Sequence, residues 1–183
     1  CGLKYRQLIN RVKTVQKKYW TEIISTNGRV SIYANKPLDE KNELDLKAQD
    51  SLTSYLLAQI ITPSIIIHRG HSYYANHTIA NIDSSAKLVL LGSCGGYQKL
   101  AAVLKRAPET QVIASKQIGK GVINAALLSQ IAETIEKGKD IVWRALWKQM
   151  NVQLKGAAKT SFQDYIPPYK NIGLMFLKTY RAQ

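Results

Sequence analysis

The residues best suited to chemistry are a histidine and a cysteine, each of which follows a short apolar run. His71 belongs to segment 68–72, which reads His-Arg-Gly-His-Ser, and Cys94 belongs to segment 92–96, which reads Gly-Ser-Cys-Gly-Gly. A cysteine attacks a carbonyl carbon as the thiolate, so it needs a nearby base and surroundings that favour negative charge. His71 could supply that base. The pair therefore predicts a hydrolase with a cysteine nucleophile.

Glycines and backbone amides beside the two residues fit this chemistry. Gly95 and Gly96 allow a sharp turn and the close approach of a substrate. The backbone N–H of Cys94, with that of Ser72 or Gly70, is expected to form an oxyanion hole, and Gly95 belongs to the same backbone site. Losing one such donor typically lowers the rate on the order of 100-fold. The start of the helix expected after the cysteine would add the positive end of its dipole.

Each of these features also has an ordinary structural interpretation. A lone cysteine at a strand end is usually a small buried hydrophobic residue, and a lone histidine in a loop is usually a surface residue. A glycine-rich turn can cradle phosphate, but this turn lacks the fuller dinucleotide and P-loop patterns. The argument for catalysis therefore depends on both residues standing at consecutive strand ends.

The elements that must position these residues form an alternating pattern of apolar strands and amphipathic helices. Runs that are apolar on both faces are typical of parallel strands covered by helices on each side, and ligands collect beyond the carboxyl ends of such strands. The pattern predicts an α/β fold, a three-layer α/β/α sandwich with a mainly parallel sheet. The expected strands are 64–68, 87–91 and 111–114, and the expected helices are 97–106, 122–136 and 141–150.

Flanking segments complete this organisation. A basic helix is expected over 3–20, because apolar residues recur there at spacings of three and four. After it, a turn at Asn27-Gly28 and a strand over 29–34 are expected. A helix should then end near Ile61, before Pro63. Toward the other end, 156–161 is expected to be a loop, and 172–177 a strand or helix. The expected domains are 1–28 (basic helix and linker), 29–150 (α/β domain) and 151–183 (an extension packed on the same domain).

Two segments together resemble the caspase-like (clan CD) cysteine peptidases, and most of all their separase and CHAT-domain branches. Residues 64–72 read Ser-Ile-Ile-Ile-His-Arg-Gly-His-Ser, an apolar block that leads to Gly-His. Residues 88–96 read Leu-Val-Leu-Leu-Gly-Ser-Cys-Gly-Gly, a second apolar block that leads to a small residue and Cys. Residues 94–96 match the right half of the caspase signature, whereas Gly-Ser replaces its left half. A glycine usually follows the family's catalytic histidine, and Ser72 stands here instead. The resemblance covers roughly residues 29–150.

The resemblance implies a caspase-like domain that hydrolyses peptide bonds through an acyl-enzyme. The family's site is a Cys-His dyad, so Cys94 and a histidine would need no third residue. His71 ranks first as that histidine because it occupies the Gly-His position. His68 is the alternative base, and His77 lies in the expected crossover turn. No metal or other cofactor is expected, and the expected partner is a protein or peptide substrate.

Family members commonly recognise a charged residue just before the cleaved bond. Lys116 and Lys120, in the loop after the third expected strand, could favour an acidic or polar group in the substrate. Asp39 and Glu40, after the first expected strand, could favour a basic group. Both sets could equally be ordinary surface residues.

Composition limits the class of protein but leaves alternatives open. With 183 residues, 45% of them hydrophobic and 21% charged, the chain is expected to be globular rather than disordered or fibrous. No apolar run reaches the roughly 18 residues that a membrane span needs. The formal net charge is +14, and residues 1–20 contain no acidic residue. Two functions therefore remain as alternatives: an inactive caspase-fold binding or scaffold domain and, ranked lower, a basic binder of nucleic acid or an anionic surface.

The chain's two cysteines, Cys1 and Cys94, do not make a disulfide framework. The leading Cys-Gly is compatible with the lipidated start of a bacterial lipoprotein and with an arbitrary domain boundary. A cytoplasmic location is favoured over a lipid anchor through Cys1, but the compartment stays open. The oligomeric state also stays open.

Overall fold

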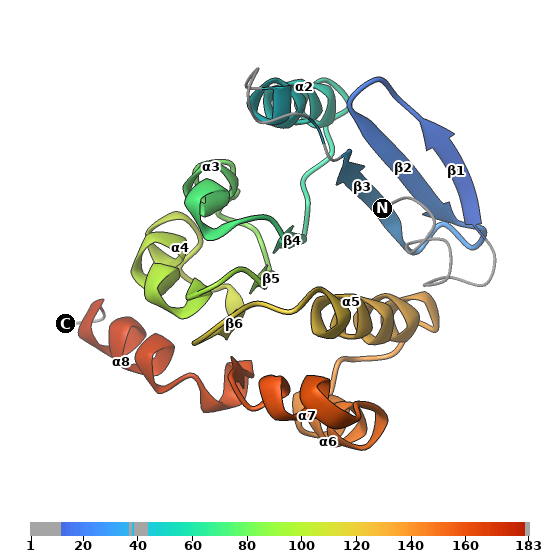
Figure 1. The fold of residues 1–183 in the computed structure, drawn as a ribbon. Helices are drawn as coiled ribbons and strands as arrows, with labels where there is room; N and C mark the ends of the chain where they lie inside the picture. Colours follow the sequence, from blue (N-terminus) through green and yellow to red (C-terminus); the bar gives the residue numbers. More distant parts are fainter. Residues whose placement is uncertain (1–11, 37, 39–43, 182–183) are drawn as a thin grey trace. The chain divides into compact units, whose positions relative to one another are not determined.

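The computed structural model describes residues 12–36, 38 and 44–181. In this part of the chain it contains seven α-helices, a three-stranded antiparallel sheet and a four-stranded mixed sheet (Figure 1). The chain divides into two compact units, one of residues 1–61 with 125–141 and the other of 62–124 with 142–183. The domain expected over 29–150 thus contains parts of both units.

The first unit contains the antiparallel sheet, in the order β1 (Val12–Gln16), β2 (Trp20–Ser25) and β3 (Ser31–Asn35). The predicted basic helix is wrong over residues 12–20, and its remainder lies outside the described residues. Val12, Thr14 and Val15 are β-branched and suit a strand, and β2 pairs with them along the whole of β1.

Two other predictions for this unit are confirmed. The turn at Asn27-Gly28 joins β2 to β3, and Gly28 has a φ of 69°, a conformation that favours glycine. Helix α2 (Leu44–Ala58) follows β3 and ends slightly before the expected residue. Helix α5 (Gly121–Glu136) begins in the second unit, and the rest of it belongs to the first.

The second unit is built on the mixed sheet, whose strand order is β4-β5-β6-β7. Strands β4 (Ile65–His68), β5 (Leu88–Leu91) and β6 (Gln111–Ser115) are parallel, as predicted from their continuous apolar character. Strand β7 (Tyr165–Ile166) adds an antiparallel edge that the sequence did not reveal.

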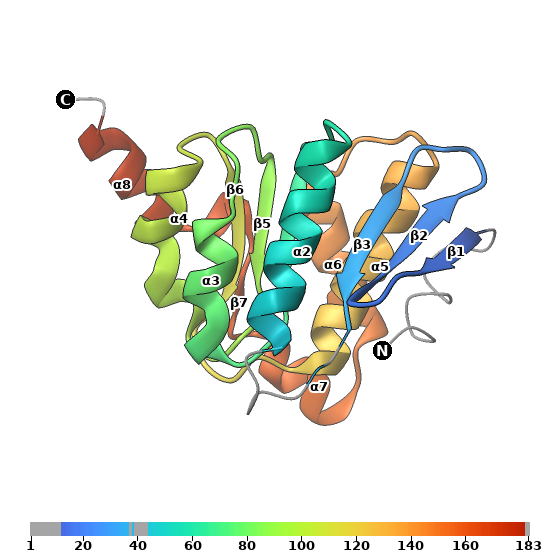
Figure 2. The same ribbon diagram turned by 90° about the horizontal axis from the view of Figure 1, so that it is seen from above.

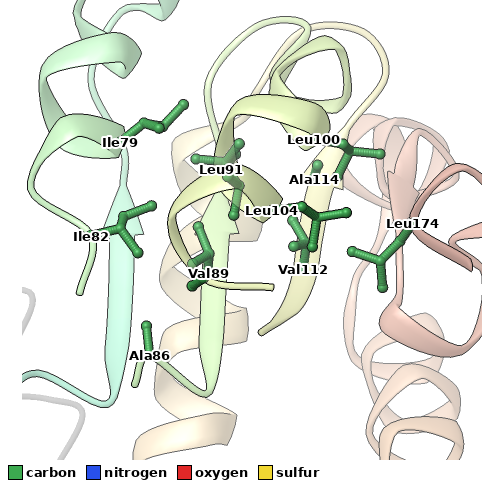
Figure 3. Close-up of a cluster of buried hydrophobic side chains, with 12 residues drawn as sticks. Ile79, Ile82, Ala86, Val89, Leu91, Leu100, Leu104, Val112, Ala114 and Leu174 are labelled. Carbon is green, nitrogen blue, oxygen red and sulfur yellow. The ribbon is translucent and has the colours of Figure 1, made fainter. Parts of the chain in front are cut away.

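Helices of the second unit are packed against this sheet (Figure 2). A cluster of buried residues from β5 and β6 packs against α3 (Ala75–Ala80), α4 (Leu100–Arg106) and α8 (Ile172–Arg181), with Leu91, Leu104 and Leu174 among its members (Figure 3). The other helices of this unit are α6 (Trp143–Gln153), α7 (Gly156–Phe162) and the short 3₁₀ helices η2 (Ser72–Tyr74), η3 (Gly96–Lys99) and η4 (Pro168–Lys170).

Two predictions near the chain's end are resolved by these helices. The prediction of a loop over 156–161 is wrong, because this segment forms α7. Phe162, at the end of α7, packs its ring 5.0 Å from that of Trp147, so burial of this aromatic residue favours the helix over a solvated loop. The segment 172–177, left open between strand and helix, is helical.

Candidate functional site

The ends of β4, β5 and β6 lie next to one another at one edge of the sheet. In the parallel register His68 pairs with Leu91, and Leu91 pairs with Ala114. The backbone N–H of Gly92 then donates to the His68 carbonyl at 3.0 Å, so the pairing continues one residue beyond β5. Adjacent strands are about 4.8 Å apart. The loops that carry His71 and Cys94 therefore leave the sheet side by side.

Cys94 is an exposed free thiol on a tight turn. Gly95 follows it with φ 63° and ψ 25°, a left-handed conformation that a residue with a side chain adopts at a cost. Glycine at this position lets the chain turn from β5 directly into η3. A single 3₁₀ turn follows the cysteine, and α4 begins only at Leu100, so the α-helical dipole expected beside the thiol is not there.

Three hydrogen bonds hold the backbone on both sides of the cysteine. Asn124 Nδ2 donates to the Gly92 carbonyl at 2.8 Å, and Ser115 Oγ donates to the Ser93 carbonyl at 2.5 Å. The Gly95 N–H donates to the Gln117 carbonyl at 2.9 Å. The thiol is thus exposed on a backbone whose polar groups are fixed by the end of β6, the loop after it and the first turn of α5.

A buried tyrosine completes this network. The Tyr165 hydroxyl donates to Asn124 Oδ1 at 2.9 Å and accepts the Lys120 N–H at 2.8 Å. Both side chains are 2% exposed. Burial raises the pKa of Tyr165, the bond from the Lys120 amide opposes the rise, and the nearby charge of Cys94 adds to it. The sequence does offer a signal for Asn124, which is a polar residue on the apolar stripe of its helix. Nothing in the sequence distinguishes Tyr165, its partner in this network.

His71 is exposed and precedes η2. Its Nδ1 accepts the Tyr73 N–H at 3.2 Å and so acts as the cap of that short helix. A neutral ring that accepts at Nδ1 carries its proton on Nε2, which then has no lone pair for a thiol proton. For His71 to act as a base, Nδ1 must release the Tyr73 amide, which costs about 1 kcal/mol for a typical hydrogen bond.

His68, the alternative base, is buried behind the same loop. Its Nε2 lies 3.1 Å from the His71 carbonyl and its Nδ1 lies 2.9 Å from Thr78 Oγ1 on α3. Because a carbonyl only accepts, Nε2 carries the proton and Nδ1 accepts from the threonine. Burial lowers the pKa of His68 and keeps it neutral. With both nitrogens engaged, it supports the loop and has none free for a thiol proton. His77, expected in a turn, lies on α3 and is exposed.

The expected oxyanion donors differ in how free they are. The Gly95 amide is engaged with Gln117. Among the described residues, no backbone acceptor is hydrogen-bonded to the Cys94 N–H, so this donor is open. Ser72 begins η2, and its φ is not positive, so the position does not need the glycine that usually follows the family's histidine. Gly70 lies against the ring of His68, where a Cβ would come within 3.3 Å.

The residues considered for a substrate pocket are only partly described. Lys116 is exposed, with its Nζ 5.6 Å from the centre of the Tyr97 ring. Lys120 is exposed at the start of α5, where its amide binds Tyr165. Asp39 and Glu40 lie outside the described residues.

A cavity of about 420 Å³, lined in part by Tyr165, lies between α6, the end of α7, β7 and η4. Its walls carry three cations, Arg144, Lys148 and Lys170, and no acidic residue. The Arg144 guanidinium lies 4.8 Å from the centre of the Tyr169 ring. The cavity is therefore basic and partly aromatic.

The fold and this edge of the sheet define an α/β protein with an exposed thiol held on a fixed turn. Within residues 12–36, 38 and 44–181, no cluster of three or more His, Cys, Asp or Glu residues is arranged to hold a metal, and no helix is long and apolar enough to cross a membrane. Comparisons of the chain with protein-family models, with curated proteins and with solved structures find no match.

Proposed function

We propose that this chain is a caspase-like cysteine endopeptidase, with Cys94 as the nucleophile and His71 as the base. The observation that supports this most directly is the parallel register of β4 and β5, since it makes the two loops leave the sheet side by side. The exposure of Cys94 adds support, because a cysteine retained only for packing is normally buried.

The reaction follows from the chemistry of the pair. His71 takes the thiol proton, and the thiolate attacks the carbonyl carbon of the scissile bond. The open N–H of Cys94 stabilises the oxyanion. When the intermediate collapses, the imidazolium gives its proton to the leaving amine. Water, deprotonated by His71, then hydrolyses the acyl-enzyme and restores the thiol.

Two measurements on the full chain test this function. The first is cleavage of a mixed peptide library, read by mass spectrometry. We expect the wild-type protein to cleave, Cys94→Ala to be inactive, and His71→Ala to be slower by about 100-fold or more. The second is iodoacetamide labelling at pH 7, with peptide mapping to separate Cys94 from Cys1. An activated thiol reacts faster than the cysteine of a free peptide.

Opposite results are equally clear. Cleavage that persists in Cys94→Ala would show that another residue is the nucleophile. A Cys94 thiol that reacts no faster than a free peptide, and is unaffected by His71→Ala, would favour the inactive caspase-fold binding domain.

A second candidate function is binding of an anionic partner. The specific observation in its favour is the cavity lined by Arg144, Lys148 and Lys170 without a carboxylate. In that function the cations would pair with phosphate, sulfate or carboxylate groups of the partner. The charge of the whole chain would assist the encounter.

A further inference from the structure

We propose that Asn124 and Tyr165 are positioning residues for Cys94: a buried relay from Tyr165 through Asn124 to the Gly92 carbonyl fixes the turn that carries the nucleophile. This inference rests on the proposed function of Cys94. In this role neither residue binds substrate or transfers a proton. Both act on Cys94 through the backbone of the turn.

The first step of the argument is the contact between Asn124 and the turn. Its Nδ2 donates to the carbonyl of Gly92, two residues before the cysteine. A Cβ at Gly92 would lie 2.3 Å from Asn124 Oδ1, so glycine is what lets the amide lie flat against the backbone here. The bond sets the direction in which the chain leaves β5.

The second step is that Tyr165 fixes the orientation of that amide. The hydroxyl accepts the Lys120 N–H, and so it directs its own proton to Asn124 Oδ1. With Oδ1 used as an acceptor, Nδ2 must face Gly92. The hydroxyl lies 2.9 Å from Asn124 Oδ1 and 3.4 Å from the Lys120 carbonyl, so the asparagine is its closer acceptor and the relay runs from Tyr165 to Gly92.

The third step is burial. Asn124 and Tyr165 are each 2% exposed, and buried polar groups without partners are costly. Rotating the amide or moving the turn would leave at least one of these groups unpaired. The network therefore favours one conformation of the turn over other conformations of the same backbone.

Electrostatics place the relay near the reacting atom as well. After the larger effect of burial, the charge of Cys94 contributes to the raised pKa of Tyr165. The tyrosine comes from the antiparallel edge strand and the asparagine from the first turn of α5. Two segments distant in the sequence thus converge on the nucleophile turn.

A merely structural role is the competing explanation, and the experiment must separate the two. Tyr165→Phe keeps the ring, whose centre lies 6.1 Å from that of Phe162, and removes only the hydroxyl. Asn124→Ala is the second variant, and it removes the amide itself. Ile113→Val, a buried change in the middle of β6, serves as a control for lost stability, and Tyr180→Phe, 70% exposed, as a control for a lost hydroxyl.

The readout is the rate of iodoacetamide alkylation at Cys94 across pH 5 to 10, measured on the full chain with urea unfolding to confirm that each variant is folded. We expect Tyr165→Phe and Asn124→Ala to alkylate several-fold more slowly at pH 7 and to shift the midpoint of the pH profile. Both controls should match the wild-type protein. Peptide hydrolysis should lose kcat, with KM little changed, in the two relay variants.

The outcomes distinguish this inference from the function on which it rests. If the wild-type thiol is activated and a folded Tyr165→Phe or Asn124→Ala keeps its rate and pH profile, the relay is structural only and the inference is wrong. If the wild-type thiol reacts like a free peptide cysteine, the proposed function fails and the inference fails with it.

Discussion

His68 and His71 lie three residues apart but have opposite environments. His68 is 6% exposed and has both nitrogens engaged, whereas His71 is exposed and caps η2 through one nitrogen. The buried His68 ring is hydrogen-bonded to the backbone carbonyl of His71. Replacing His68 should therefore lower the stability of the fold directly. It should affect the candidate site only indirectly, by shifting the loop that carries His71.

Replacing His68 should change how stability depends on pH. Because burial lowers its pKa, the unfolded chain binds more protons between the folded pKa and the unfolded value of about 6.5. The contribution of His68 to the free energy of unfolding should thus be fully present above pH 6.5 and be lost as the pH drops through the lowered folded pKa. His68→Gln should lose about 1 to 3 kcal/mol at pH 7.5, because hydrogen bonds to Thr78 or the loop are lost.

Urea unfolding at pH 5, 6 and 7.5 measures this effect. The difference between wild-type protein and His68→Gln should shrink toward pH 5. His77→Gln, an exposed change on α3, should track the wild-type protein. A constant difference across the three pH values would contradict a buried neutral His68.

At the scale of elements, the site depends on how the loops after β5 and β6 fit together. Gly119 lies so close to the first of these loops that a Cβ would come within 1.9 Å of the Gly92 carbonyl oxygen. The same carbonyl accepts the hydrogen bond from Asn124. The two loops are therefore packed backbone to backbone, and α5 contacts the first of them through the Asn124 side chain.

This contact predicts a sharp contrast between two neighbouring glycines. Gly119→Ala should lower the free energy of unfolding by about 1 to 3 kcal/mol, as overpacking usually does, and should slow alkylation of Cys94 because the turn must shift. Gly121→Ala should have little effect on either, since nothing lies within 4 Å of its Cβ position. Thermal unfolding and iodoacetamide labelling measure both effects, and equal behaviour of the two variants would refute the close packing.

At the scale of the whole molecule, the charge of +14 is large enough to govern encounters with polyanions. Charge alone does not show whether binding is diffuse or localised. The basic cavity is a concave, acid-free part of that charge, with Lys148 on α6 and Lys170 on η4.

Retention on heparin distinguishes localised from diffuse binding. We expect the wild-type protein to bind at low salt and to elute as salt rises. The double variant Lys148→Glu, Lys170→Glu should elute at lower salt than Lys87→Glu, Lys105→Glu, which changes the net charge equally at exposed lysines outside the cavity. Equal elution of the two would mean that the charge acts as a diffuse surface and would remove the second candidate function.

Much of the second unit could be predicted because its signals are local. Strands β4, β5 and β6 are continuous apolar runs, and their positions follow from the sequence to within one residue at each end. Position after a strand end made His71 and Cys94 candidates, and the resemblance to the Gly-His position ranked His71 above His68 and His77. The basic helix failed, because apolar residues at spacings of three and four in a β-branched segment also suit a strand once a partner strand is present.

The sequence by itself determined the parallel strands, the helices that follow them and the two residues at their ends, because apolar periodicity and glycine positions are properties of short segments. Only the tertiary structure decided which histidine is buried and which is exposed, that β7 adds an antiparallel edge, and that Tyr165 meets Asn124 behind the cysteine turn. These depend on hydrogen bonds between residues 41 positions apart or on burial by a neighbouring helix. Such contacts leave no pattern in any one segment, because their free energy exists only when the segments come together.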